Sequence, residues 1–200
     1  MRKLLFVALA LGTASGAWAQ DTSFRGFRLE GNAGWDWSHV RHNGGNDKFG
    51  FGGEAGFDGQ IGDHIVIGPE FDYWQPNRRR NTIALAAPAG AASSLQARDQ
   101  VGAALRIGYL ANPDLLIYGK GGYVNEAQRA YFLAPPGGIS TVSRYHVDGY
   151  QAGGGIEYTL HDRFSFAPSG VYVSAQYVYD RFDNRTTDQH AMGGIGIRLK

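Results

Sequence analysis

Apolar and polar residues alternate with a period of two along most of this chain. The alternation is clearest in Ile117–Tyr123, Gly149–Tyr158 and Ala191–Leu199, where apolar or aromatic residues are separated by Gly, Gln, Glu, Lys or Arg. Successive side chains of a β-strand point to opposite faces, so this period predicts strands with one apolar and one polar face. We therefore expect an all-β protein.

Eight strands are expected, joined by connections of alternating length. The predicted strands are residues 27–40, 48–61, 64–75, 98–109, 115–126, 145–158, a segment within 164–180, and 188–199. Short turns are expected at 62–63, 111–114 and 159–163, and longer polar connections at 41–47, 76–97, 127–144 and 181–187. Pro69 predicts a bulge, because proline removes a donor from the ladder. The alternation of long and short connections is typical of an antiparallel up-and-down transmembrane barrel with short periplasmic turns and long external loops.

The direction of the apolar face separates a membrane barrel from a soluble one. A soluble lipocalin-type barrel would bury its apolar face and be recovered from the periplasm. Here the opposite face combines glycine with both signs of charge, which suits a narrow lumen. Hardly any charge lies on the apolar face, where a midplane Lys or Arg would cost about 2–4 kcal/mol. That face also carries aromatic residues near the strand ends, as in a membrane-interface belt: Trp35, Trp37, Tyr73, Tyr109, Tyr123, Tyr150, Tyr158, Tyr177 and Tyr179. Lipid is therefore expected outside.

The N-terminus has the features of a secretion signal. Arg2 and Lys3 precede the apolar stretch Leu4–Leu11, and Ala17–Ala19 is a small-x-small cleavage site, so we expect a signal peptide at 1–19 and one barrel domain at 20–200. The chain has no cysteine, and without Arg2 and Lys3 it holds 17 basic and 18 acidic residues. This charge balance gives no reason to expect a nucleic-acid partner.

The polar face predicts a charged lumen. Its residues are Glu30, Glu54, Glu70, Asp72, Arg106, Lys120, Glu157 and Arg198. Unpaired buried charges are costly, so these side chains are expected to form ion pairs that fill the bore. A structural plug is the preferred interpretation, and a selective pore or gate is the alternative.

Four segments together resemble a known family. They are Leu116–Val124, Asp148–Tyr158, Val173–Tyr179 and the final glycine-alternating strand, behind the signal peptide. In this order they are similar to the small outer-membrane β-barrel proteins of the opacity/porin-like superfamily of Gram-negative bacteria, especially its alphaproteobacterial branch. The resemblance implies a barrel inserted from the periplasm by the barrel-assembly machinery, with periplasmic chaperones. Family members usually end in an aromatic residue, whereas this chain ends Leu199-Lys200, and Leu199 is expected to be the last outward residue.

Candidate chemistry is sparse, and no enzyme is expected. Ser143, His146 and Asp148 are the nearest grouping to a hydrolase triad, but residues three apart in a strand lie on opposite faces. No spacing of His, Asp and Glu suggests a metal site, and no cofactor motif is present. Arg78, Arg79 and Arg80, in the second long loop, are candidates for contact with lipopolysaccharide phosphates, because guanidinium matches phosphate geometry.

The sequence therefore predicts a monomeric structural or surface-exposed protein of the outer membrane. Its partners are expected to be membrane lipid and lipopolysaccharide, and its interaction surface the external loops. Two alternatives stay open: a narrow porin-like channel for small solutes, and an adhesin that uses loops 76–97 and 127–144.

Overall fold

The computed structural model describes residues 24–40, 44–77, 83–85, 87–136, 138–160, 170–184 and 186–199. Its elements are the strands β1 (Gly26–Val40), β2 (Gly44–Ile61), β3 (Ile65–Pro76), β4 (Ile83–Leu85), β5 (Ala92–Asn112), β6 (Leu115–Leu133), β7 (Thr141–Thr159), β8 (Val171–Phe182) and β9 (Thr186–Leu199). No helix long and apolar enough to cross a membrane occurs in these ranges. The predicted signal peptide lies outside the described residues.

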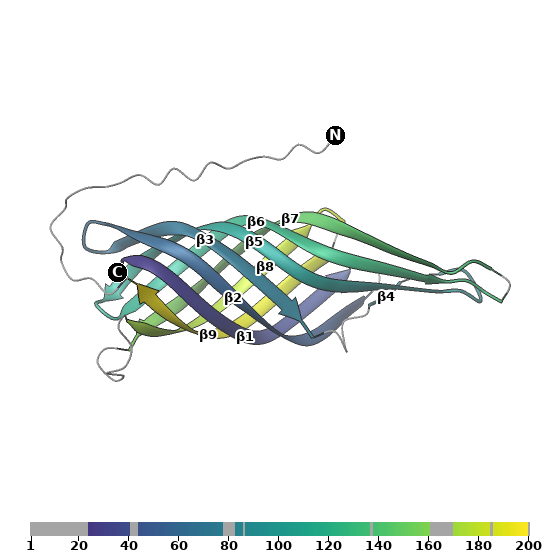
Figure 1. Cartoon of the computed structure of the whole chain (residues 1–200), viewed down its shortest axis with the longest axis horizontal. Helices are drawn as coiled ribbons and strands as arrows, with labels where there is room; N and C mark the ends of the chain where they lie inside the picture. The colour runs from purple at the N-terminus through teal and green to yellow at the C-terminus, as the bar shows by residue number, and fades with distance from the viewer. Residues whose placement is uncertain are drawn as a thin grey trace.

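The strands form one antiparallel sheet that closes into a ring. The order is β3-β2-β1-β9-β8-β7-β6-β5-β4, and β3 also pairs with β5 from Ile65↔Tyr109 to Trp74↔Gln100. That pairing closes an eight-stranded barrel and leaves the three-residue β4 outside the ring, against β5 (Figure 1). The ring matches the predicted up-and-down topology.

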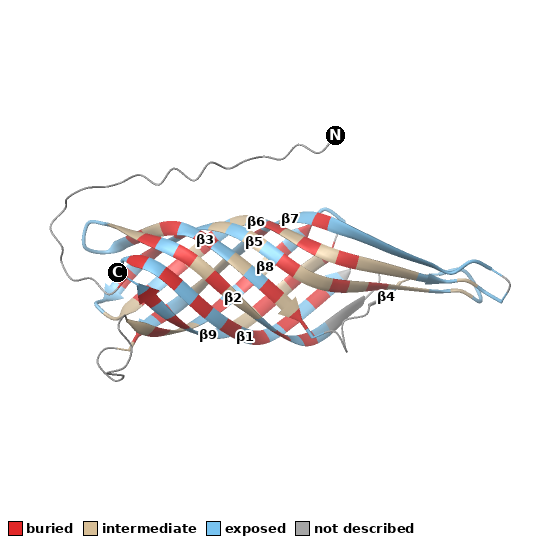
Figure 2. Ribbon diagram, viewed as in Figure 1, coloured by how far each residue is buried: buried red, intermediate tan, exposed pale blue. Residues whose placement is uncertain are grey.

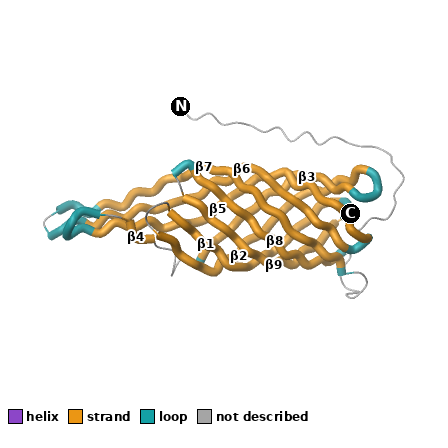
Figure 3. The backbone as a smooth tube through the Cα atoms, turned by 180° about the vertical axis from the view of Figure 1, so that it is seen from behind, coloured by secondary structure: helices purple, strands orange, loops and turns teal. Residues whose placement is uncertain are grey.

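Three strands continue past one end of the ring. β5 pairs with β6 as far as Ala92↔Leu133, and β6 with β7 as far as Phe132↔Thr141, whereas β7 pairs with β8 only from Gly149 onward. Together with β4, residues 92–97, 126–133 and 141–148 form what we call the projecting sheet (Figures 1 and 3). The opposite end of the ring, called the turn end, carries the tight connections at 62–64 and 113–114.

The predicted strand cores agree with the structure, but the predicted connections 41–47, 76–97, 127–144 and 181–187 are too long. The strands extend into them, since β2 begins at Gly44, β5 at Ala92, β7 at Thr141 and β9 at Thr186, while β6 ends at Leu133 and β8 at Phe182. Arg129 and Arg144 stand on the face that is apolar lower in the same strands. The alternation of apolar and polar residues therefore fades where both faces of a strand meet polar surroundings, although the ladder continues.

The predicted bulge at Pro69 is wrong. The β2–β3 ladder lacks the two pairs between Gly56↔Glu70 and Gly59↔Ile67, yet its register is the same on both sides of the gap. Pro69 also keeps its place opposite Leu105 in β5. A Cβ on Gly68 would lie 1.8 Å from the Phe57 carbonyl oxygen, so glycine permits a close approach of β2 and β3 here. The missing donor is accommodated without an inserted residue.

Burial alternates along every ring strand (Figure 2). The outward face exposes large apolar side chains, for example Phe51, Phe57, Phe71, Leu105 and Ile195. Of the nine predicted interface aromatics, eight are exposed and Tyr179 is half-buried. A surface this apolar requires an apolar surrounding, which agrees with lipid outside and a polar interior.

Candidate functional site: a charged lumen and a projecting sheet

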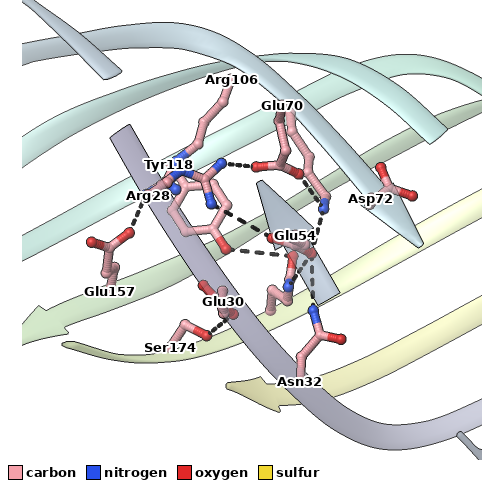
Figure 4. A network of polar contacts seen from close by, with 12 residues as sticks. Arg28, Glu30, Asn32, Glu54, Glu70, Asp72, Arg106, Tyr118, Glu157 and Ser174 are labelled. Atoms are coloured by element: carbon pink, nitrogen blue, oxygen red, sulfur yellow. Dashed lines mark hydrogen bonds and ion pairs between the residues drawn. The ribbon is translucent and has the colours of Figure 1, made fainter. Parts of the chain in front are cut away.

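A continuous set of ion pairs fills the lumen nearer the turn end, and Figure 4 shows part of it from close by. We call it the central ion-pair network, and its members are Arg28, Glu54, Asp58, Glu70, Arg106, Lys120, Glu157 and Arg198. The side chains of all eight are at most 2% exposed. They come from β1, β2, β3, β5, β6, β7 and β9, so the network ties together most of the ring.

Each carboxylate in the network serves more than one cation. Glu70 pairs with Arg28 and lies 2.7 Å from Lys120 Nζ through Oε1. Glu157 Oε2 lies 2.5 Å from Arg106 Nη2, and Glu157 Oε1 lies 2.6 Å from Arg198 Nη1.

Asp58 and Glu54 complete the chain of contacts. Asp58 Oδ2 lies 2.8 Å from Arg198 Nη2 and 3.4 Å from Arg28 Nε. Glu54 Oε1 accepts from Lys120 Nζ at 3.2 Å, and also from Asn32 and Gln176. Shared partners compensate the desolvation of these charges.

Two of the predicted lumen charges make hydrogen bonds instead of ion pairs. Glu30 accepts from the Ser174 hydroxyl, and Asp72 accepts from Gln151 Nε2 at 2.8 Å. The other six predicted residues belong to the central ion-pair network. Asp58 and Arg28 are buried members that the predicted set leaves out, although both lie on the polar face of their strands.

Glycines make room for these side chains. A Cβ on Gly194 would lie 2.1 Å from Glu30 Oε1, and one on Gly102 would lie 2.3 Å from Asp72 Oδ2. A Cβ on Gly196 would lie 2.2 Å from the Tyr172 ring. The glycines on the polar face therefore fit a narrow lumen, in which positions with large side chains alternate with positions that have none.

The lumen is packed on the turn-end side of the network and holds only a small cavity on the other side. Phe24, Val66, Leu110, Leu116 and Tyr118 form a buried apolar cluster at the turn end. The Arg106 guanidinium stacks 3.8 Å from the centre of the Tyr118 ring, a cation–π contact. On the other side lies a cavity of about 20 Å³, room for a single water molecule.

A second buried group lies toward the projecting sheet. We call it the upper polar cluster: Asp36, Lys48, Asp180, Asp188 and His190. Sequence reasoning missed it as a unit, because its members come from β1, β2, β8 and β9. The local signal was Asp188 and His190, which are two residues apart in one strand and therefore share a face.

Comparison with known proteins identifies the family. The model of a family described as "outer membrane protein beta-barrel domain" matches residues 5–193. The chain belongs to this family. It is therefore an outer-membrane protein of Gram-negative bacteria. The family consists of non-enzymatic barrel domains, in agreement with the expectation that the chain is not an enzyme. No curated protein matches the chain.

Solved structures show the same fold for this outer-membrane barrel. Ail, the attachment invasion locus protein of Yersinia pestis, has a TM-score of 0.53 and 10% identity, covering 88% of this chain and 99% of its own. Neisserial surface protein A has a TM-score of 0.52 and 16% identity, covering 86% of this chain and 97% of its own. At these identities the likeness concerns the fold alone. In the fold of this family the turn end is periplasmic and the projecting sheet is external.

The outer-membrane barrel separates the residues considered for hydrolysis. His146 points outward from β7 with Nδ1 3.1 Å from Asn125 Oδ1, and Asp148 accepts from Tyr123 and Asn125. Ser143, an odd number of residues away, lies on the other face. Arg78, Arg79 and Arg80 lie outside the described residues.

Two other arginines stand together on the outward face of the projecting sheet. Arg129 of β6 and Arg144 of β7 are direct cross-strand partners. Like charges in this position destabilise an antiparallel pair, since their Cβ atoms lie about 4.5–5.5 Å apart. Neither forms an ion pair with any residue that the structure describes.

Proposed function

We propose that this protein is a closed, non-conducting barrel that presents the projecting sheet as an interaction surface for anionic groups at the cell surface. The observation that carries the proposal is the contrast between the two parts of the molecule. The lumen is occupied by buried, mutually paired charges, whereas the projecting sheet carries a cross-strand pair of a half-buried and an exposed arginine, Arg129 and Arg144, without an acidic partner among the described residues.

The position of the arginine pair favours the phosphates of lipopolysaccharide as ligand. Tyr123 and Tyr150, the outward aromatics of the same two strands, are about half exposed and paired with each other. Interface aromatics mark the headgroup level. Arg129 and Arg144 lie six residues further along each strand, about 20 Å at roughly 3.3 Å per residue, so they stand beyond the apolar band on the side of the projecting sheet. Guanidinium binds phosphate oxygens in a bidentate geometry.

The proposal includes several expectations from the sequence. Arg78–Arg80 remain candidates for contact with the same phosphates. Insertion by the barrel-assembly machinery, with periplasmic chaperones, and a monomeric state belong to the same hypothesis.

Adhesion through residues 76–97 and 127–144 is the second candidate function. Ail, which shares the fold, is an attachment invasion locus protein. The projecting sheet supports adhesion by this chain as well, because both segments contribute strands to it.

Binding of purified lipopolysaccharide to the detergent-solubilised barrel tests the proposal. The Arg144→Gln variant is expected to bind about 10- to 100-fold more weakly, because it loses one charge-assisted contact worth about 1.5–3 kcal/mol. Arg25→Gln is the matched control, since Arg25 is also exposed but lies beside the start of β1, at the turn end. Equal affinity in all three proteins would contradict the assignment to the arginine pair.

A replacement of residues 129–144 by a short turn separates function from folding. The ring pairs β6–β7 below Gln128↔Tyr145 are retained, so the barrel is expected to fold and show its usual heat-modifiable migration on gels. Loss of both lipopolysaccharide binding and cell adhesion would support the proposed surface, and retention of both would refute it.

A further inference from the structure

We propose that the upper polar cluster binds one divalent transition-metal ion, with Asp36, Asp188 and His190 as its protein ligands. Zn²⁺ is the ion whose chemistry these ligands match best. This inference concerns the lumen and does not depend on the external binding surface proposed above.

The three side chains converge from neighbouring strands. Asp36 of β1 is the register partner of His190 in β9, and Asp188 precedes His190 by two residues on the same face. One oxygen of each aspartate and one ring nitrogen of the histidine lie within 4.8 Å of one another. Ligands bound to one zinc ion at about 2.0–2.2 Å stand about 3.4 Å apart. Small side-chain rotations would therefore bring all three into contact with one ion.

Nδ1 of His190 lacks a hydrogen-bond partner among the described residues, and the Asp188 carboxylate receives no N–H or hydroxyl donor there; the two residues are 2% and 1% exposed. The carboxyl group of Glu126 lies within hydrogen-bond reach of Asp188. The nearest cation to Asp188 is Lys48, whose Nζ lies 4.0 Å from Oδ2. Buried polar atoms are nearly always satisfied, so orphaned atoms that converge on one point indicate a missing partner.

Surrounding groups hold the ligands in the orientation that a metal needs. Asp180 Oδ2 lies 2.9 Å from His190 Nε2, so this carboxylate holds a proton on Nε2 and leaves the Nδ1 lone pair directed at Asp36. The Trp74 indole donates to Asp36 Oδ2 at 3.1 Å. Metal-bound histidines usually donate their second ring N–H to a carboxylate in this way.

Charge balance supports a divalent ion. Asp36, Asp180 and Asp188 face one permanent cation, Lys48, which lies 3.5 Å from Asp36. Glu126 is also buried and lies beside Asp188 and Lys48, so it adds a fourth carboxyl group to the surroundings of this cluster. A dication next to neutral His190 would bring the summed charge of the three aspartates and Lys48 to zero when Glu126 carries a proton shared with Asp188. The competing account is a protonated His190 that bridges Asp180 and Asp36 without metal.

The donor set favours zinc over the alkaline-earth ions. Imidazole nitrogen suits Zn²⁺ and other late transition metals, whereas Ca²⁺ and Mg²⁺ take oxygen ligands almost exclusively. Trp74, Asp180 and His190 also line the lumen cavity of about 20 Å³, which leaves space for one water molecule beside the ion.

The test is a metal titration of the full-length barrel in detergent after chelator treatment. Zn²⁺ affinity is measured by competition with a chromophoric chelator, and Co²⁺ absorption reports nitrogen–oxygen ligation. We expect one ion per barrel, a loss of at least about 100-fold in affinity for His190→Ala, and about a tenfold loss for Asp180→Asn, whose carboxylate only positions the histidine. His146→Ala is the matched control, because that histidine is exposed on β7, and it should bind like the parent protein.

Either of two outcomes would overturn the metal site. Absence of stoichiometric Zn²⁺ binding by the parent protein would leave the protonated histidine as the explanation of the cluster. Unchanged binding in a His190→Ala barrel that still shows heat-modifiable migration would place the ion elsewhere. If His190→Ala does not fold, the Co²⁺ spectrum of the parent protein and the Asp180→Asn affinity decide the question by themselves.

Discussion

Glu70 illustrates how single residues hold the lumen together. Its carboxylate contacts both Arg28 and Lys120, and none of the three is exposed by more than a few per cent. A buried ion pair contributes little over an apolar substitute, but removal of one partner leaves uncompensated charge in a medium of low dielectric constant. The network is therefore more sensitive to truncation than its contacts, taken one by one, suggest.

The Glu70→Ala variant should lower the free energy of unfolding by about 3–5 kcal/mol, because two buried cations lose a shared partner. Denaturant titration of the barrel in detergent or lipid vesicles would measure the effect. Asp183→Ala, at an exposed turn position, is the control and should change stability by less than about 0.5 kcal/mol. A similar effect of both substitutions would mean that the network does not stabilise the fold.

Two adjacent glycines in β6 offer a second residue-scale prediction. A Cβ on Gly122 would lie 2.1 Å from the Ala103 carbonyl oxygen, whereas one on Gly121 would lie 3.8 Å from its nearest neighbour. Gly122→Ala should destabilise the barrel by about 1–3 kcal/mol through overpacking, and Gly121→Ala should be nearly neutral. The same denaturant titration distinguishes the two variants. Equal unfolding midpoints for both would show that β5 and β6 move apart enough to admit a methyl group at Gly122 without cost.

At the scale of the element, the sequence predicts where strands exist better than where they end. Alternation identifies every ring strand, because a lipid-facing side must be apolar and a lumen-facing side polar. It is lost in residues 92–97 and 127–133, where the outward face carries residues such as Gln96 and Arg129. Backbone hydrogen bonds to a neighbouring strand extend these segments. Such bonds do not depend on the side chains, so they cannot be predicted from the alternation of apolar and polar residues in one strand.

The cost of introducing arginine at two equally exposed positions should show which part of the sheet faces lipid and which part faces water. Leu105 and Val142 are both 56% exposed, but Leu105 lies in the middle of the apolar band and Val142 in the projecting sheet. Leu105→Arg should cost about 2–4 kcal/mol in lipid vesicles, and Val142→Arg about 0–1 kcal/mol. Equal costs would place the membrane boundary elsewhere.

At the scale of the whole molecule, closure through β3–β5 followed from the count of strands, but the meeting of distant residues did not. The central ion-pair network was foreseeable, because a lumen that holds charges of both signs must pair them. The upper polar cluster was not, because it depends on Asp36, Asp180 and His190 reaching the same height on three strands. The relative shift of neighbouring strands decides which residues reach the same height, and this shift cannot be predicted from a single sequence.

The packed lumen predicts that the barrel conducts poorly. Planar-bilayer recordings of the purified protein should remain at baseline, since the central ion-pair network fills the bore and the cavity beside it holds only about 20 Å³. Stable single-channel steps in the parent protein that disappear with Arg106→Ala or Glu70→Ala would contradict this and favour the porin-like alternative.

A closed ring leaves no strand without two neighbours, but the projecting sheet breaks that rule. From Thr141 to Asp148, β7 has β6 on one side and no strand on the other within the described residues. The Asp148 carbonyl still accepts from the Asp183 amide at 3.0 Å, but the residues before it have no strand partner on that side among the described residues, whereas Gly149–Thr159 are held by β8. A single strand should therefore show two rates of hydrogen–deuterium exchange, with the change falling near Gly149. The membrane barrel thus carries at its outer end a sheet edge that is open to solvent.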